Sequence, residues 1–204
     1  MHPTSIDVAE TFHDRASDAL RPAVTDAITD AVLDELAACG YTRLSMDGVA
    51  RRAGCSKPSL YRRWPSKQEM VIGVLHTIVV PAVPATPPSG DLRTDVREVV
   101  LTTFAWMNHT VVRQVLPDLI AESVRNPSFA QLLDTRVSAP RRAVARAALQ
   151  ASIGDATVSD RDLEFVLDII AAPFFWRMFA RRHDVDDQFI ESVTQLVCLH
   201  ITSG

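Results

Sequence analysis

Two short helical patterns joined by a glycine constrain the fold of this chain more than any other feature. The first pattern covers 46–53, follows Ser45 and repeats its apolar residues at i, i+3 and i+4. The second covers 57–64, follows Ser56 and has a proline in its first turn, where the missing N–H is harmless. A serine can cap each helix, and Gly54 tolerates the positive φ of a tight turn. The segment therefore predicts a helix-turn-helix.

The second of these helices has a face suited to DNA. At about 100° per residue, Leu60 and Trp64 point toward the core. The opposite face is small or cationic and comprises Pro58, Ser59 and Arg62, with Lys57, Tyr61 and Arg63 on its flanks. Such a face fits a major groove. Arg62 is the candidate for bidentate contact with guanine, Ser59 for a base edge or phosphate, and Pro58 for a thymine methyl group, while the flanking lysine and tyrosine suit phosphates.

The charge of this region differs from that of the rest of the chain. Residues 41–69 hold seven of the 21 Lys and Arg residues and only two acids, a net charge of +5. Because the whole chain carries −4, the remainder carries −9. A basic region on an acidic protein is typical of binding to a polyanion, although an ordinary solvated surface is the alternative. Ser66 and Glu69 form a capping box for the next helix, where Lys67 and the free N–H groups suit another phosphate.

These residues resemble the N-terminal domain of the TetR family of bacterial transcriptional regulators. The segments that carry the resemblance are Ser45–Ala50, Ala53–Ser56, Lys57–Trp64 and Pro65–Lys67, within roughly 22–80. Residues 159–201 resemble the last two helices of the family's ligand-binding domain. The resemblance implies a homodimeric repressor that binds a palindromic operator and is released by a small-molecule effector.

The resemblance also implies roles for single residues. Carried over by position, the phosphate contacts would be Ser45, Lys57, Tyr61 and Lys67, and the residues that face bases would be Ser59 and Arg62. Two positions depart from the family pattern. Arg63 stands where histidine is usual, which affects operator contacts, and Gly48 stands where a residue with a side chain is usual, which weakens the first of the two helices.

The remaining pattern predicts an all-α fold with two domains. We expect an N-terminal extension, 1–20, that is frayed or helical; a three-helix helix-turn-helix domain, 21–80; a proline-rich connector, 81–90; and a helical ligand-binding and dimerisation domain, 91–204. Four prolines keep the longest uncharged stretch, 70–90, too short for a membrane span. The three cysteines lack metal-ligand or paired spacing, and no secretory signal is visible, so we expect a cytoplasmic protein without disulfides.

The last two predicted helices, 160–180 and 186–201, are apolar over most of their surface. A helix that is apolar on every face must be covered on every face. We therefore predict that the two helices form a two-fold dimer interface, the alternative being central helices of a monomer. Among the preceding helices, Pro117 is expected to interrupt one, and Pro140 to kink or divide another.

Aromatic and polar residues of this C-terminal domain are candidates for a ligand pocket. The set comprises Phe104, Met107, His109, Gln114, Phe174, Phe175, Arg177 and Met178, with Trp106 and Trp176 beside them. Ligand pockets are mostly apolar with few orienting polar groups, which fits this set. Aromatic residues at helical spacing also occur as plain core, and that alternative stays open.

Other functions receive less support from the sequence. No phosphate-binding loop or catalytic motif occurs, so an enzyme is not indicated, and the histidines lack metal-ligand spacing, so we expect neither metal nor cofactor. A carrier of small apolar ligands, or a protein-interaction module, would use residues 91–204 but would leave the basic region without a role. Cys55 lies near cations at a helix start, which allows a redox switch, although a small turn residue is the simpler interpretation.

Overall fold

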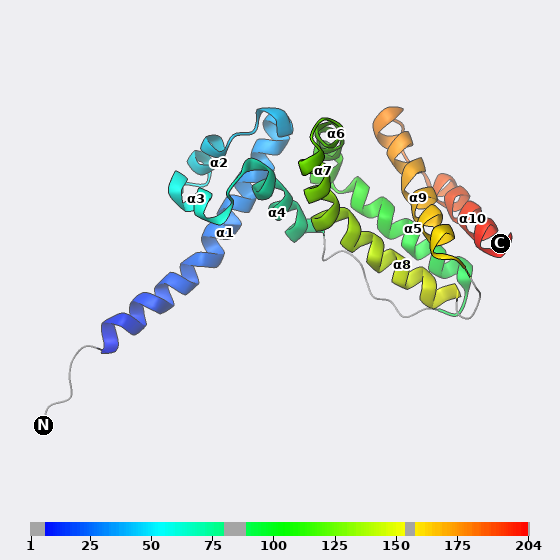
Figure 1. Cartoon of the computed structure of the whole chain (residues 1–204), viewed down its shortest axis with the longest axis horizontal. Coiled ribbons are helices and arrows are strands. Elements are labelled where there is room, and N and C mark those ends of the chain that lie inside the picture. The colour runs from blue at the N-terminus through cyan, green and yellow to red at the C-terminus, as the bar shows by residue number, and fades with distance from the viewer. Residues whose placement is uncertain (1–6, 80–88, 154–157, 204) are drawn as a thin grey trace, which may run out of the picture. The chain divides into compact units, whose positions relative to one another are not determined.

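The fold is all-α and divides into two compact units. The computed structural model in Figure 1 describes the backbone of residues 7–79, 89–153 and 158–203, and side chains within 25–77, 89–153 and 158–203. Within these ranges the regular secondary structure is helical, and no strand occurs. The first unit runs from Met1 to Val74 and the second from Leu75 to Gly204. The whole of the predicted extension, 1–20, and most of the predicted connector, 81–90, lie outside the residues whose side chains are described.

The first unit contains α1 (Asp7–Arg43), α2 (Met46–Arg52), α3 (Lys57–Arg63) and the beginning of α4 (Lys67–Val79). Gly40 has a φ of 72°, so α1 is broken there, before its last residues. The core side chains of this unit are almost fully buried and include Ile28, Val32, Leu36, Tyr41, Leu44, Val49, Leu60, Met70 and Val71. This core holds α2 and α3 against α1.

The second unit is a helical bundle in which α5 is central. Its elements are α5 (Leu92–Asn108), α6 (Thr110–Arg125), α7 (Pro127–Leu133), η2 (Asp134–Ser138), α8 (Ala139–Ile153), α9 (Asp160–Phe175), η3 (Trp176–Ala180) and α10 (Asp187–Ser203). Helix α5 packs against α8, α9 and α10 (Figure 1). The core between them contains Val96, Val100, Leu149, Val166, Ile170, Phe174, Ile190 and Val197. The side chains of Asp91, Asn126 and Ser159 cap α5, α7 and α9.

The prolines of this unit have different effects. The prediction that Pro117 interrupts a helix is wrong, because α6 continues through it. Its neighbours Leu116 and Leu119 are buried, and this packing outweighs the lost hydrogen bond. Pro140 lies in the first turn of α8, directly after the wide π-helical turns of η2. The chain stays helical from Pro127 to Ile153, so what the structure shows near Pro140 is a change from π-helical to α-helical turns and not an interruption.

Helix α4 spans the boundary between the two units. The division falls after Val74, in the middle of the helix, whereas the sequence pattern placed a domain boundary in 81–90. Residues on both sides of the division are buried, including Val74 and Leu75. A continuous helix therefore contributes to the core of the first unit with one part and to the second unit with the other.

Candidate nucleic-acid interface and ligand cavity

Helix α2 and the following turn have the geometry that the sequence predicted. The backbone N–H of Gly48 donates to Ser45 Oγ at 3.1 Å, so Ser45 is the N-cap. Gly54 has a φ of 64°, a conformation that glycine adopts without strain. The N–H of Cys55 then donates to the carbonyl of Ala50 at 3.0 Å and closes the end of the helix. The turn thus leads the chain directly into the next helix.

Helix α3 presents a cationic outer surface. Ser56 Oγ accepts from the N–H of Ser59 at 3.3 Å, which confirms the predicted cap. Leu60 is fully buried, and Trp64 lies against Gly73, where an added Cβ would come within 2.8 Å of the indole nitrogen. The exposed or half-exposed residues are Lys57, Pro58, Ser59, Tyr61, Arg62 and Arg63. The predicted faces of this helix are therefore confirmed, with Trp64 only half-buried.

The cations around this surface differ in their partners. Lys57 Nζ lies 2.5 Å from Asp47 Oδ2, with both side chains more than half exposed. The Arg63 guanidinium lies 5.5 Å from the centre of the Trp64 ring. Arg62 is exposed and makes no ion pair or hydrogen bond with the residues that the structure describes. Its five N–H donors are therefore available to an external acceptor.

Gly48, one of the two departures from the family pattern, has a local structural explanation. A Cβ at this position would lie 3.1 Å from Glu35 Oε2 and from Ser45 Oγ, closer than an ordinary contact. Glu35 Oε1 accepts from Arg52 Nε at 2.9 Å, so this ion pair joins α1 to the end of α2. Glycine leaves room for the Glu35 carboxylate over α2, and this contact offsets part of its cost in a helix.

Lys67 is held by the first unit itself. Its Nζ donates to the carbonyls of Tyr41 and Thr42 at 3.1 and 3.3 Å and lies 4.5 Å from the centre of the Tyr41 ring. The N–H of Glu69 donates to Ser66 Oγ at 3.1 Å, which confirms that Ser66 caps α4. An ammonium group has three donors, so Lys67 retains one for a phosphate while it ties the start of α4 to the end of α1.

We predict that Lys67→Met lowers the stability of the first unit. The methionine keeps the apolar stem but leaves the carbonyls of Tyr41 and Thr42 without this donor, at a cost of about 1–2 kcal/mol. Lys57→Met is the matched control, because an exposed ion pair contributes about 0–1 kcal/mol. Urea denaturation followed by circular dichroism measures both. Equal stability of the two variants would contradict the structural role of Lys67.

The second unit encloses a cavity of about 490 Å³. Its walls come from α5, α8 and α9, which lie side by side in Figure 1. The apolar part of the lining includes Val99, Met107, Ala145, Ala148, Leu167 and Ile170. Trp106 and Ser138 also line a second, smaller cavity of about 50 Å³, whose wall includes Leu75 of α4. Trp106 therefore borders both cavities.

The structure places one of the eight proposed pocket residues, Met107, in the wall of the large cavity. Phe104 packs on Phe174 with ring centres 5.5 Å apart, and Phe175 packs on Phe179. Phe174 and Met178 are buried in the core, whereas His109 and Gln114 are exposed. Arg177 donates to the carbonyl of Asp184 at 2.7 Å and covers Phe189. Phe104 and Met107 point only about 60° apart around the helix, yet Met107 borders the cavity while the Phe104 ring packs on Phe174.

Several polar residues of the cavity wall were not among the candidates from the sequence. They are Ser89, Thr94, Asp95, Glu98, Thr102, Thr103, Ser138, Arg141, Arg142 and Ser152. Most of them lie on α5 and α8, whose shared face becomes visible only once the two helices are paired. The adjacent arginines after Pro140 were a usable signal, because cations on a helix with few local acids need partners elsewhere.

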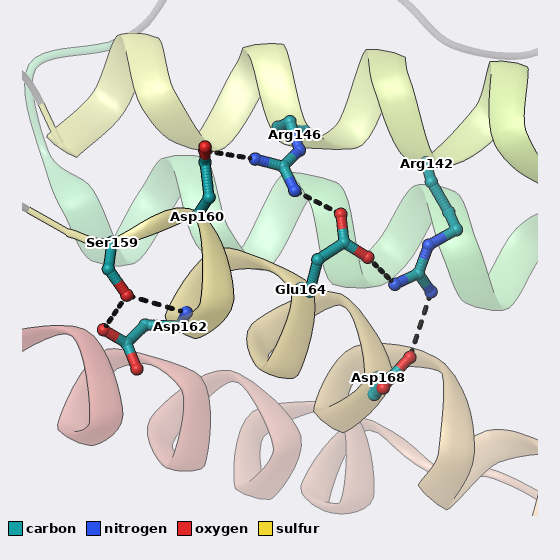
Figure 2. Close-up of polar contacts among 7 residues, drawn as sticks. All are labelled: Arg142, Arg146, Ser159, Asp160, Asp162, Glu164 and Asp168. Carbon is teal, nitrogen blue, oxygen red and sulfur yellow. Dashed lines mark hydrogen bonds and ion pairs between the residues drawn. The ribbon is translucent and has the colours of Figure 1, made fainter.

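A network of ion pairs joins α8 to α9 beside the cavity (Figure 2). Glu164 accepts hydrogen bonds from both Arg142 and Arg146. Arg142 Nη1 also donates to Asp168 Oδ1 at 3.0 Å, and Arg146 Nη1 donates to Asp160 Oδ1 at 2.8 Å. The bond from Arg142, followed by that from Arg146, lowers the pKa of the Glu164 carboxyl below its ordinary value. Arg142, although it lines the cavity, is committed to this network.

We predict that the network makes stability depend on pH. A carboxyl whose pKa is lowered by folding stabilises the protein above its ordinary pKa of 4.5 and loses this contribution as the pH falls through the folded value. Thermal melts should therefore show Glu164→Gln less stable than the wild type at neutral pH, with a difference that shrinks below about pH 4.5 and disappears only below the folded pKa. Glu98→Gln is the control and should follow the wild type. A constant difference for Glu164→Gln across this range would rule out the ionic contribution.

The helix-turn-helix unit and the cavity-bearing helical unit together define a DNA-binding regulator of the two-domain type, and comparison with known proteins identifies the family. Residues 28–74 match the family model of bacterial regulatory proteins of the tetR family. Residues 86–197, more than half of the chain, match the tetracyclin repressor-like C-terminal domain. The chain belongs to the TetR family of transcriptional regulators.

Individual relatives agree with this assignment. The uncharacterized HTH-type transcriptional regulator Rv1556 of Mycobacterium tuberculosis is 33% identical over 123 residues, which cover 59% of this chain and 58% of that protein, less than two thirds of its length. The DNA-binding transcriptional repressor TetR of Mycobacteroides abscessus is 26% identical and covers 82% of this chain and 87% of its own. The crystal structure of the TetR family transcription regulator SCO0332 superposes with a TM-score of 0.66 at 25% identity, over 86% of this chain and 97% of that chain.

The described parts of the chain contain no metal site and no helix that could span a membrane. Among these residues, no group of histidine, cysteine and acidic side chains is arranged to hold a metal ion. No helix of the described ranges is both long and apolar enough to cross a bilayer. The chain has two candidate sites, the exposed surface of α3 in the first unit and the cavity of the second unit.

Proposed function

We propose that this protein is a ligand-responsive repressor that binds a near-palindromic operator as a homodimer and is released by a small molecule. The observation that carries the proposal is the exposed cationic surface of α3, where Arg62 has no partner within the described residues. An uncommitted guanidinium on the outer face of a short capped helix suits recognition of guanine in the major groove. As a regulator of the chromosome, the protein would act in the cytoplasm.

The contacts with the operator divide into two kinds. Arg62 and Ser59 face the bases, with Pro58 near a thymine methyl group. The contacts to phosphate come from Ser45, Lys57, Tyr61, Arg63 and Lys67. Ser45 accepts a backbone N–H in its cap and keeps its own hydroxyl proton for a phosphate oxygen. Lys57 would exchange its exposed pair with Asp47 for a phosphate, at little cost because the pair is hydrated.

The proposed dimer forms through α9, η3 and α10. Phe165, Ala172 and Trp176 lie at helical spacings of seven and four on one exposed face of α9 and η3, and Phe165 and Trp176 are 53% and 63% exposed. Leu196 and Leu199 are about half exposed on α10, which packs beside α9. Large apolar side chains exposed together mark an association surface. A second copy of the same face would cover them in an isologous contact.

Release from the operator is proposed to begin in the 490 Å³ cavity. A ligand there would contact Trp106, which also borders the smaller cavity beside Leu75 of α4. Movement of the indole toward Leu75 would shift α4, which continues into the first unit. The ligand must bind the released conformation more tightly than the DNA-bound one, because only this difference moves the equilibrium.

A gel shift with duplex DNA that flanks the protein's own coding region tests the proposal. We expect a complex that survives an excess of random DNA, with half-sites about 34 Å apart or a multiple of this distance. Only cationic contacts release counterions, so Lys57, Arg63 and Lys67 of the two subunits give an expected slope of roughly −5 for log affinity against log salt. If the protein is a folded dimer but does not shift the DNA, the result would instead favour the alternative, a small apolar-ligand carrier or protein-interaction module.

A further inference from the structure

The large cavity has polar groups of different charge at its two ends. Asp95 and Trp106 are eleven residues apart on α5, and Arg141 and Ser152 are eleven residues apart on α8. The Arg141 guanidinium lies 4.3 Å from the centre of the Trp106 ring, while Ser152 lies near Asp95. The two helices therefore run antiparallel along the cavity. At 1.5 Å per residue the two ends are about 16 Å apart.

One end of the cavity is anionic. The backbone N–H of Ser89 donates to Asp95 Oδ1 at 2.8 Å. This bond, with smaller contributions from the hydroxyls of Ser89 and Ser152, holds the pKa of the Asp95 carboxyl below its ordinary value although burial opposes it. Glu98 lines the cavity one helical turn further along α5. An anionic group of a ligand would be repelled from this end.

The other end of the cavity carries a cation and an indole N–H. Arg141 is half-buried over Trp106, and burial lowers the pKa of its guanidinium to about 10, so the group stays charged in surroundings that disfavour charge. The indole N–H of Trp106 is buried and lacks an acceptor within the described residues. Ser138 lines the cavity beside them. A desolvated cation next to an indole donor is best stabilised by an anion with acceptor oxygens.

We propose that the effector is an elongated, mainly apolar molecule with a carboxylate that binds at the Arg141–Trp106 end of the cavity. The inference rests on the proposed function, because it treats this cavity as the effector site. Its apolar body would contact Val99, Ala148, Leu167 and Ile170 in the middle of the cavity. The carboxylate would face Arg141 and remain distant from Asp95. This arrangement fixes the orientation of the bound ligand in the cavity.

Three probes with the same ten-carbon chain test the charge that the cavity prefers. Isothermal titration of the full-length protein with decanoate, decan-1-ol and decylammonium, all kept below micelle formation, measures the three affinities. We expect decanoate to bind about tenfold or more tightly than either of the others, because a charged hydrogen bond contributes about 1.5–3 kcal/mol. Arg141→Gln should remove this preference and leave the affinity for decan-1-ol within about twofold.

The controls separate this inference from the proposed function. Arg136→Gln removes an exposed arginine of η2 outside the cavity lining and should bind decanoate like the wild type. Unchanged decan-1-ol binding shows that Arg141→Gln is folded. Equal or tighter binding of decan-1-ol or decylammonium, an unaltered preference in Arg141→Gln, or no binding of any probe overturns the carboxylate assignment. DNA binding in the gel shift does not depend on these results. The gel shift therefore tests the assignment as a regulator independently of the carboxylate assignment.

Discussion

Replacing Phe165 and Leu199 together by glutamate is expected to convert the protein into a folded monomer at micromolar concentration. The two side chains are 53% and 55% exposed in one subunit, on α9 and α10, and Phe165 packs edge-on against His200 with ring centres 5.0 Å apart. In the proposed dimer each glutamate would be buried without a partner, which costs several kcal/mol per charge. The dimer dissociation constant should rise by at least about 100-fold.

The same double substitution should also weaken operator binding. A dimer binds its second half-site at high effective concentration, and a monomer loses this gain of about 10²- to 10⁴-fold. Sedimentation equilibrium and fluorescence anisotropy with operator DNA measure the two effects. The matched control is Val124→Glu, which places the same charge at an exposed valine of α6, away from the proposed interface. A double variant that remains dimeric would show that α9 and α10 do not form the interface.

Replacing Arg62 by alanine is expected to give the second large effect, a loss of sequence recognition. The exposed guanidinium has no partner within the described residues, so its removal should leave the fold of the first unit unchanged. A bidentate contact with guanine contributes about 1–3 kcal/mol of discrimination. We expect the free energy of operator binding to weaken by about 1–3 kcal/mol per half-site. The affinity for random DNA should change much less.

Arg63→Ala is the control for this prediction. Its guanidinium lies over Trp64 at the flank of α3, where it is expected to contact phosphate. This substitution should weaken operator and random DNA alike and make the salt slope less steep by about 2 for the dimer. Anisotropy titrations at several salt concentrations measure both variants. If Arg62→Ala and Arg63→Ala cause equal losses on both kinds of DNA, the division between base and phosphate contacts is wrong.

The DNA-binding surface could be predicted because its determinants are local in sequence. Ser45, Ser56 and Ser66 each accept from an N–H three residues later, and Gly54 adopts the expected positive φ. A helix period of 3.6 residues then orients Leu60 inward and its polar neighbours outward. What the sequence did not reveal is how the charges are engaged. Tyr41 and Lys67 are 26 residues apart, and only folding brings the ammonium group to the carbonyl.

The cavity could not be predicted in the same way. Its wall depends on the antiparallel pairing of α5 with α8, which sets Trp106 against Arg141 and Asp95 near Ser152. Local periodicity indicates which residues are apolar, but it does not distinguish a side chain that fills the core, such as Phe174, from one that borders a cavity, such as Met107. The arginines after Pro140 indicated that partners are needed but not where they lie, since Arg142 finds its acids on α9.

Methylation interference on the flanking operator DNA tests the central claim most directly. Methylation of guanine N7 blocks the major-groove contact that a bidentate arginine makes. If α3 of each subunit reads one half-site, interference should occur at symmetric guanines about one helical turn apart or a multiple of this distance, and Arg62→Ala should abolish it at those guanines while other sites remain. Interference without two-fold symmetry, or a pattern that is identical in Arg62→Ala, would contradict the account.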